Sequence, residues 1–155
     1  MEKSCKPLEK SSISPMGQAI EAAQKAAQRG EVPVGAVLVK GGEILVVTGN
    51  GVEEGKDPTA HAEAIRQGAA LLGDVRLTEC DLYVTLEPCA MCAQALAHAR
   101  IRRLYFGAYD PKGGGVDHGA KVFDHPTCHH KPEVYGGLEE EKCAFLLKEF
   151  FQKRR

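Results

Sequence analysis

The stretch from Leu82 to Cys92 reads LYVTLEPCAMC, and it decides the fold because a strand leads directly into a helix there. Residues 82–86 form a short apolar run that is typical of a strand. Pro88 follows at a position where the fixed φ angle of proline and its missing N–H suit the start of a helix. We expect this helix to continue to about Ala99.

Strand and helix patterns alternate on both sides of this stretch. Ser14-Pro15 has the form of a helix N-cap, and Gly41-Gly42 has the form of a hairpin turn. In chain order, the other expected elements are a helix over 15–30, strands 34–39 and 44–48, a helix over about 59–72, strands 103–107 and 133–135, and a final helix. This order predicts an α/β fold, a three-layer α/β/α sandwich with a central mixed five-stranded sheet.

Length and composition indicate one ordinary globular domain. The chain has 155 residues, so we expect a flexible leader over 1–14 and a single domain over 15–155. No apolar run is long enough for a membrane span or resembles a signal peptide, so we expect a cytoplasmic protein without a membrane partner. The formal net charge of -1 gives no sign of a nucleic-acid partner. The local basic clusters at 100–103 and 153–155 are, without further support, ordinary solvated surface.

The last helix carries an apolar stripe, which we expect to face the core. Its members, at spacings i, i+3, i+4, i+7 and i+8, are Cys143, Leu146, Leu147, Phe150 and Phe151. The preceding loop contains a possible second metal cluster, made of His125, Cys128, His129 and His130. We do not favour this cluster, because a loop rich in glycine and proline gives its ligands no fixed spacing.

The strongest chemical signal is a set of three metal ligands. Cys89 and Cys92 are three residues apart on an expected helix, so their side chains share one face. Both are expected in the first turn, where the helix dipole favours the thiolate form that binds metal. With His61, they make a three-ligand site for one Zn²⁺ per chain, and the open fourth position is typical of catalytic zinc.

Glu63 is expected to move protons rather than bind the metal. It lies two residues from His61, a rotation of about 200° on a helix, so the two side chains cannot easily hold one ion. A carboxylate beside a water that zinc has acidified suits proton transfer. Alone, the cysteine pair could be a redox pair or half of a structural zinc site, but its conjunction with His61 and Glu63 favours catalysis.

These fragments, His-x-Glu and Pro-Cys-x-x-Cys, are the signature of zinc deaminases. From about Met16 to Arg155 the chain resembles the bacterial tRNA-specific adenosine deaminases, which convert a wobble adenosine to inosine. The matching segments include 31–38 (EVPVGAVL), 57–63 (DPTAHAE), 82–92 and 150–155 (FFQKRR). The resemblance implies a cytidine deaminase-like fold, hydrolytic deamination, a tRNA anticodon stem-loop as the partner, and a homodimer.

The resemblance also implies substrate contacts at single positions. Those at the base pocket are Asn50, Pro33, Val34 and the backbone N–H of Ala62; those nearer the RNA are Asp110, His129 and Phe150. Read without the family, Asn50 is a turn residue and Asp110 caps a loop. An aromatic and basic ending suits RNA, where bases stack on rings and cations meet phosphates.

The chain departs from the family pattern directly after Glu63. The family usually has two more residues before the following Ile-Arg pair, and losing two residues turns the later face of a helix by about 200°. Packing behind the first turn must therefore adjust, and the adjustment is expected near Gly68 or Gly73.

Two other functions are weighed. A deaminase of free nucleobases or nucleosides, of guanine or cytosine type, would carry the same zinc fragments, but a small substrate does not require the basic, aromatic ending. A non-catalytic RNA-binding scaffold would not need the proton shuttle, and Glu63 is present.

Overall fold

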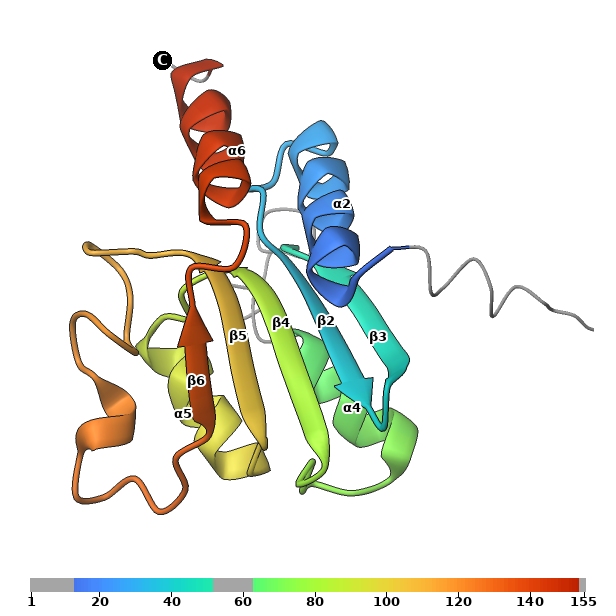
Figure 1. Ribbon diagram of the computed structural model, residues 1–155, viewed down its shortest axis with the longest axis vertical. Coiled ribbons are helices and arrows are strands. Elements are labelled where there is room, and N and C mark those ends of the chain that lie inside the picture. The colour runs from blue at the N-terminus through green and yellow to red at the C-terminus, as the bar shows by residue number, and fades with distance from the viewer. Residues whose placement is uncertain (1–12, 52–62, 154–155) are drawn as a thin grey trace, which may run out of the picture.

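The computed structural model describes residues 13–51 and 63–153 (Figure 1). The predicted leader therefore lies almost entirely outside the described residues, as do His61 and Ala62. In chain order the elements are α2 (Pro15–Gln28), β2 (Gly35–Lys40), β3 (Glu43–Gly49), α4 (Glu63–Leu72), β4 (Cys80–Leu86), α5 (Ala90–Ala99), β5 (Arg103–Ala108), the 3₁₀ helix η1 (Val122–Asp124), β6 (Glu133–Gly136) and α6 (Glu140–Lys153).

The described strands form one mixed sheet in the order β3-β2-β4-β5-β6. β2 is antiparallel to both β3 and β4, whereas β4, β5 and β6 run parallel. Helices α2 and α6 pack on one face, and α4 and α5 lie on the opposite face (Figure 1). The predicted three-layer sandwich with five strands is confirmed.

Local sequence signals explain the first elements. The Ser14 hydroxyl accepts a hydrogen bond from the Gly17 N–H at 3.0 Å, and Pro15 occupies the first helical position of α2. Both residues of the hairpin turn, Gly41 and Gly42, have positive φ angles of 58° and 80°. Only glycine adopts such angles readily, so this turn selects its residues.

The core lies chiefly between the sheet and the layer of α4 and α5. Leu38, Leu96, Leu104 and Phe106 are at most 1% exposed there. Apolar burial of this kind provides most of the favourable free energy of folding. Among the described residues, no helix combines the length and the apolar character that crossing a bilayer requires.

The predicted core stripe of the last helix is wrong at Phe151, and its middle members are only half-buried. Cys143 is buried, but Phe151 is 50% exposed, and Phe145, which lies outside the stripe, is 60% exposed. The helix contacts β5, β4 and α2 and then extends past the edge of the sheet (Figure 1). Periodicity predicts which side chains share a face, but not how far the neighbouring layer reaches.

Two residues fewer than the family usually has follow Glu63, yet α4 continues through Gly68. The helix stops before Gly73, whose φ is 66°. Gly68 packs directly against the Leu38 side chain, so that a Cβ atom there would collide with it. This close approach fixes the rotation of α4 against β2.

Candidate active site

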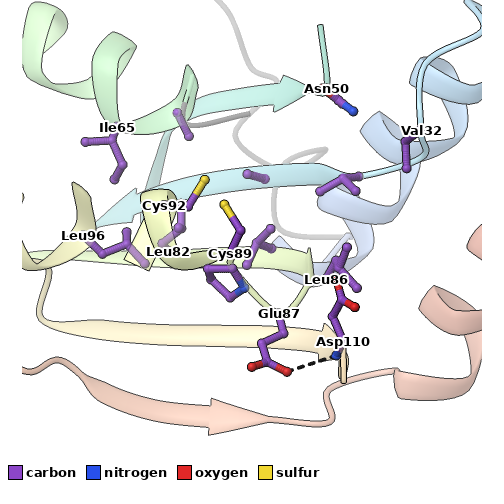
Figure 2. Close-up of a pocket in the computed structure, with 15 residues that line it drawn as sticks. Val32, Asn50, Ile65, Leu82, Leu86, Glu87, Cys89, Cys92, Leu96 and Asp110 are labelled. Atoms are coloured by element: carbon purple, nitrogen blue, oxygen red, sulfur yellow. Dashed lines mark hydrogen bonds between the residues drawn. The ribbon is translucent and has the colours of Figure 1, made fainter. Parts of the chain in front are cut away.

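A cavity of about 220 Å³ lies between the sheet and the helices α4 and α5 (Figure 2). Its walls are mainly apolar side chains from β2, β4, α4 and α5, and the polar residues that line it are Asn50, Cys89, Cys92 and Asp110, together with Glu87, whose carboxylate is turned away from the cysteine sulfurs. An apolar enclosure with a few convergent polar groups is the usual form of a small-molecule site.

The two cysteines of the predicted metal site both line this cavity, and Figure 2 shows their sulfur atoms directed into the same space. Cys89 is the N-cap of α5 rather than a residue of its first turn, since its backbone is extended. The prediction is corrected in that detail, while Cys92 lies in the first turn as expected.

The Cys89 side chain forms a hydrogen bond with that of Cys92 and, together with burial, raises the pKa of Cys92 above its ordinary value. Two adjacent, half-buried sulfurs resist forming two thiolates, unless a cation balances their charge. The pair therefore has the donor chemistry that a soft divalent cation would fit.

Glu63 is the first residue of α4, and its carboxylate accepts hydrogen bonds from the Arg66 guanidinium and from Gln67 Nε2, the latter at 3.1 Å. It lines a smaller cavity that adjoins the main one and shares Val34 and Asn50 with it. His61 lies outside the described residues, and within 13–51 and 63–153 no three His, Cys, Asp or Glu side chains gather as a metal cluster.

The residues expected at the base pocket lie just before β2 and just after β3. Asn50 lies at the end of β3, where its N–H donates to Val34 O at 2.9 Å and its carbonyl accepts from Arg29 Nη2 at 3.2 Å. Val34 lines the cavity with Asn50, whereas Pro33 is fully buried and the neighbouring Val32 lines the cavity. Ala62 lies outside the described residues.

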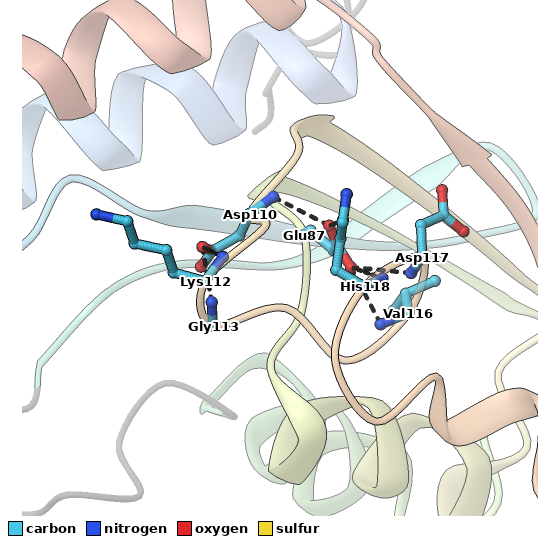
Figure 3. A network of polar contacts seen from close by, with 7 residues as sticks. All are labelled: Glu87, Asp110, Lys112, Gly113, Val116, Asp117 and His118. Atoms are coloured by element: carbon cyan, nitrogen blue, oxygen red, sulfur yellow. Dashed lines mark hydrogen bonds and ion pairs between the residues drawn. The ribbon is translucent and has the colours of Figure 1, made fainter.

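Asp110 also lines the cavity, directly after β5. Its Oδ1 accepts hydrogen bonds from the N–H groups of Lys112 at 3.3 Å and Gly113 at 2.9 Å (Figure 3). The loop-capping role is therefore present in the structure, at a position that also faces the cavity.

Sequence reasoning assigned no role to Glu87, which joins β4 to α5. It is 2% exposed, and its carboxylate accepts from the N–H groups of four residues and from His118 Nδ1 (Figure 3). Burial alone would raise its pKa, but these hydrogen bonds prevail and hold the pKa of Glu87 below its usual value. The sequence did place an acid directly after a buried strand. Because a buried charge requires partners, this position could have indicated a structural role for Glu87.

The expected RNA contacts lie away from the cavity. His129 is exposed, and its carbonyl accepts from Arg100 Nη1 at 3.4 Å. Phe150 lines a groove between α2 and α6 and meets the ring of Phe151 edge to face, with 5.4 Å between ring centres. Neither residue lines the main cavity.

The loop histidines bind backbone carbonyls instead of one another. His125 Nε2 donates to Ala120 O at 2.6 Å, and His130 Nε2 donates to Ile101 O at 2.7 Å. In the described part of the chain, this loop forms no metal cluster.

Comparison with known proteins places this geometry in a family. Residues 10–108 match the model of the cytidine and deoxycytidylate deaminase zinc-binding region. The chain is 53% identical over 142 residues to the tRNA-specific adenosine deaminase of Agrobacterium fabrum, covering 90% of this chain and 93% of that protein. It is 49% identical over 140 residues to the corresponding Aquifex aeolicus protein, covering 88% and 91%.

Two solved structures support the same placement. One, from studies of A-to-I editing by tRNA:A34 deaminases at the wobble position, has a TM-score of 0.84 and 53% identity, covering 86% of this chain and 98% of that one. The guanine deaminase of Bacillus subtilis has a TM-score of 0.61 and 31% identity, covering 87% and 91%. The chain therefore belongs to the cytidine and deoxycytidylate deaminase family, and within that family to the tRNA-specific adenosine deaminases.

Proposed function

We propose that the protein hydrolyses the wobble adenosine of a tRNA anticodon to inosine, with release of ammonia. The observation that carries this proposal is the Cys89–Cys92 pair, which faces an apolar cavity that Asn50 and Glu87 also line. The relatives at 53% identity that are described as tRNA-specific adenosine deaminases and as tRNA:A34 deaminases support the choice of substrate.

The proposed cofactor is one zinc ion per chain, held by His61, Cys89 and Cys92. The match to the family's zinc-binding region supports it, as does the position of the Cys89 and Cys92 sulfurs at one cavity. When bound, zinc supplies Lewis-acid chemistry, which promotes ionisation of a water molecule and offsets negative charge that develops on the substrate.

Glu63 is the proposed proton shuttle. Its carboxylate takes a proton from the attacking water, whose oxygen bonds to C6 of adenine. The protonated carboxyl delivers that proton to the ring nitrogen N1. It then takes the proton of the new C6 hydroxyl and passes it to the amino group, so that the C6–N bond breaks and inosine and ammonia are the products. Arg66 and Gln67 both donate to Glu63 Oε2, which holds the carboxylate beside the smaller cavity.

The proposed substrate contacts divide into two groups. Asn50, Val34 and the Ala62 N–H hold the base, with the fully buried Pro33 behind Val34, and Val34 and Asn50 already line the cavity. Asp110, His129 and Phe150 contact the RNA around it, and the exposed ring of Phe151 beside Phe150 suits stacking with unpaired bases. The homodimer that the family resemblance implies is part of the same proposal.

Deamination of a free purine is the second candidate. The observation that favours it is the similarity to the guanine deaminase of Bacillus subtilis, at 31% identity and a TM-score of 0.61. Deamination of a free purine remains the second candidate, because the tRNA:A34 deaminase structure is more similar to this chain, with a TM-score of 0.84 and 53% identity.

The test incubates the purified protein with an anticodon stem-loop, a full tRNA, free adenosine and free guanine. Inosine should form in the two RNA substrates only, and Glu63→Ala should abolish it. Glu79→Ala, which removes an exposed acid before β4, is the matched control and should keep full activity. Deamination of guanine with the tRNA untouched would contradict the proposal, and active protein without zinc would contradict the cofactor.

A further inference from the structure

Glu87 has an unusual set of partners for a buried acid. Its Oε1 accepts from the Asp110 N–H at 3.0 Å and from His118 Nδ1 at 2.8 Å. Its Oε2 accepts from three consecutive backbone N–H groups, those of Val116, Asp117 and His118, at 2.9–3.1 Å (Figure 3). One carboxylate therefore fixes both ends of the segment 110–118.

Only a carboxylate satisfies this arrangement. Both of its oxygens face N–H donors, and an ionised carboxylate is the side chain that accepts at both ends. Glutamine in the same place would direct its NH₂ group at N–H donors in either orientation. Buried donors without partners are costly, so the segment would have to open toward water.

The segment also packs tightly on the start of α5. The Gly115 N–H donates to Pro88 O at 2.8 Å, and a Cβ at Gly115 would lie 2.6 Å from Ala90 N. A Cβ at Gly114 would collide with the Glu87 carboxylate itself. The two glycines thus permit a contact that brings the segment next to Cys89.

We propose that Glu87 is a positioning residue, which holds the segment 110–118 against the start of α5 and so places Asp110 at the wall of the substrate cavity. This inference rests on the proposed function, since it assumes that the cavity receives the adenosine. Glu87 itself acts through the segment and not on the reacting atoms.

Glu87→Gln tests the proposal through two readouts. Hydrogen exchange of the backbone N–H groups of Asp110, Val116, Asp117 and His118 should accelerate about tenfold or more. The KM for the anticodon stem-loop should rise about tenfold with a smaller change in kcat, because the displaced segment carries Asp110 but neither Glu63 nor the cysteines. A purely structural role would lower the active fraction, hence kcat, and leave KM unchanged.

Two variants separate the role of the segment from the charge of Glu87. Gly114→Ala keeps the carboxylate but displaces the segment, so it should reproduce the rise in KM and the faster exchange. His118→Ala removes one of the five donors and should raise KM only about two- to threefold. Both remain informative if Glu87→Gln fails to fold.

The matched control is Asp124→Asn, the same acid-to-amide change in an exposed ion pair with Lys131 at 3.1 Å. It should alter neither readout. Unchanged exchange and KM in Glu87→Gln or in Gly114→Ala would overturn the inference, as would a fall in kcat alone. If the wild-type protein leaves tRNA untouched, the proposed function fails, while the exchange data still decide whether Glu87 holds the segment.

Discussion

The two ends of strand β4 each carry a buried acid, but their partners differ. At the amino end, Asp81 is 7% exposed and pairs with the guanidinium of Arg102 through two hydrogen bonds of 2.9 and 3.0 Å. Just beyond the carboxyl end, Glu87 is 2% exposed, and four of its five donors are backbone N–H groups.

The difference between Asp81 and Glu87 shows how one strand can stabilise the sheet at one end and fix the shape of the substrate cavity at the other. An arginine side chain can adjust its rotamers, so the Asp81 pair joins β4 to the start of β5 without dictating a loop conformation. Backbone N–H groups cannot adjust separately, so Glu87 imposes one conformation on the segment that borders the cavity. Ligand sites of open α/β sheets lie at the carboxyl ends of strands, where such shaping matters.

The largest expected effect contrasts the cysteines at the two ends. Cys92→Ala should remove bound zinc and lower deamination on the order of 10³-fold, because a proposed ligand is lost. Cys80→Ala, a change at a 1% exposed residue of the amino end, should keep both the zinc content and the activity. Both variants are compared by metal analysis for zinc content and by inosine formation for activity. Equal loss of zinc in both variants would remove the functional distinction between the ends.

The second effect concerns Gly107, near the carboxyl end of β5. A Cβ there would lie 2.8 Å from Thr85 O and 2.9 Å from Cys143 Cβ, so β5 has no room between β4 and α6. Gly107→Ala should lower the free energy of unfolding by about 2–3 kcal/mol, as overpacked sites do. Urea unfolding measures it. A neutral result would mean that α6 moves aside at little cost.

A smaller effect is expected at the amino end. Asp81→Asn weakens the pair with Arg102, whose side chain is 43% exposed, and should lower Tm by about 2–4 °C. KM should stay at the wild-type value, in contrast to Glu87→Gln. Calorimetry and steady-state kinetics give the two values, and a raised KM in Asp81→Asn would show that the amino end also shapes the site.

The smallest effect is a pH dependence at Cys143, which packs on β5 from α6. Burial raises the pKa of Cys143 to about 11, from an ordinary value of 9.0. The folded state favours the neutral thiol. The contribution of this thiol to the free energy of unfolding is therefore complete below pH 9 and is lost as pH rises toward 11. Relative to Cys143→Ala, the wild type should lose about 1 kcal/mol by pH 10. Identical pH profiles of unfolding would contradict the burial of this thiol.

The local parts of the fold were predictable because short-range chemistry specifies them. Ser14-Pro15 caps α2, paired glycines make the first hairpin, and the apolar run before Pro88 forms β4. The end of α6 was not predictable in the same way, since the exposure of Phe151 depends on where the neighbouring layer stops.

The candidate site was predicted in part. The spacing of Cys89 and Cys92 was sufficient to bring both to one cavity, because residues three apart meet across a helical turn. Glu87 was missed, since its partners lie 23–31 residues away in sequence and are backbone groups that carry no residue-specific signal.

Sequence alone dictates the features of this protein that depend on neighbours along the chain: the order of strands and helices, the cysteine pair at the start of α5, and the glycines that allow tight turns. Three-dimensional packing settles what depends on distant neighbours. It sets the position of Glu63 beside a small cavity formed with β2, β3 and β4, the burial of Glu87 under the segment 110–118, and the exposed rings of α6. The physical reason is that burial and hydrogen-bond satisfaction are properties of the assembled layers, which no local pattern encodes.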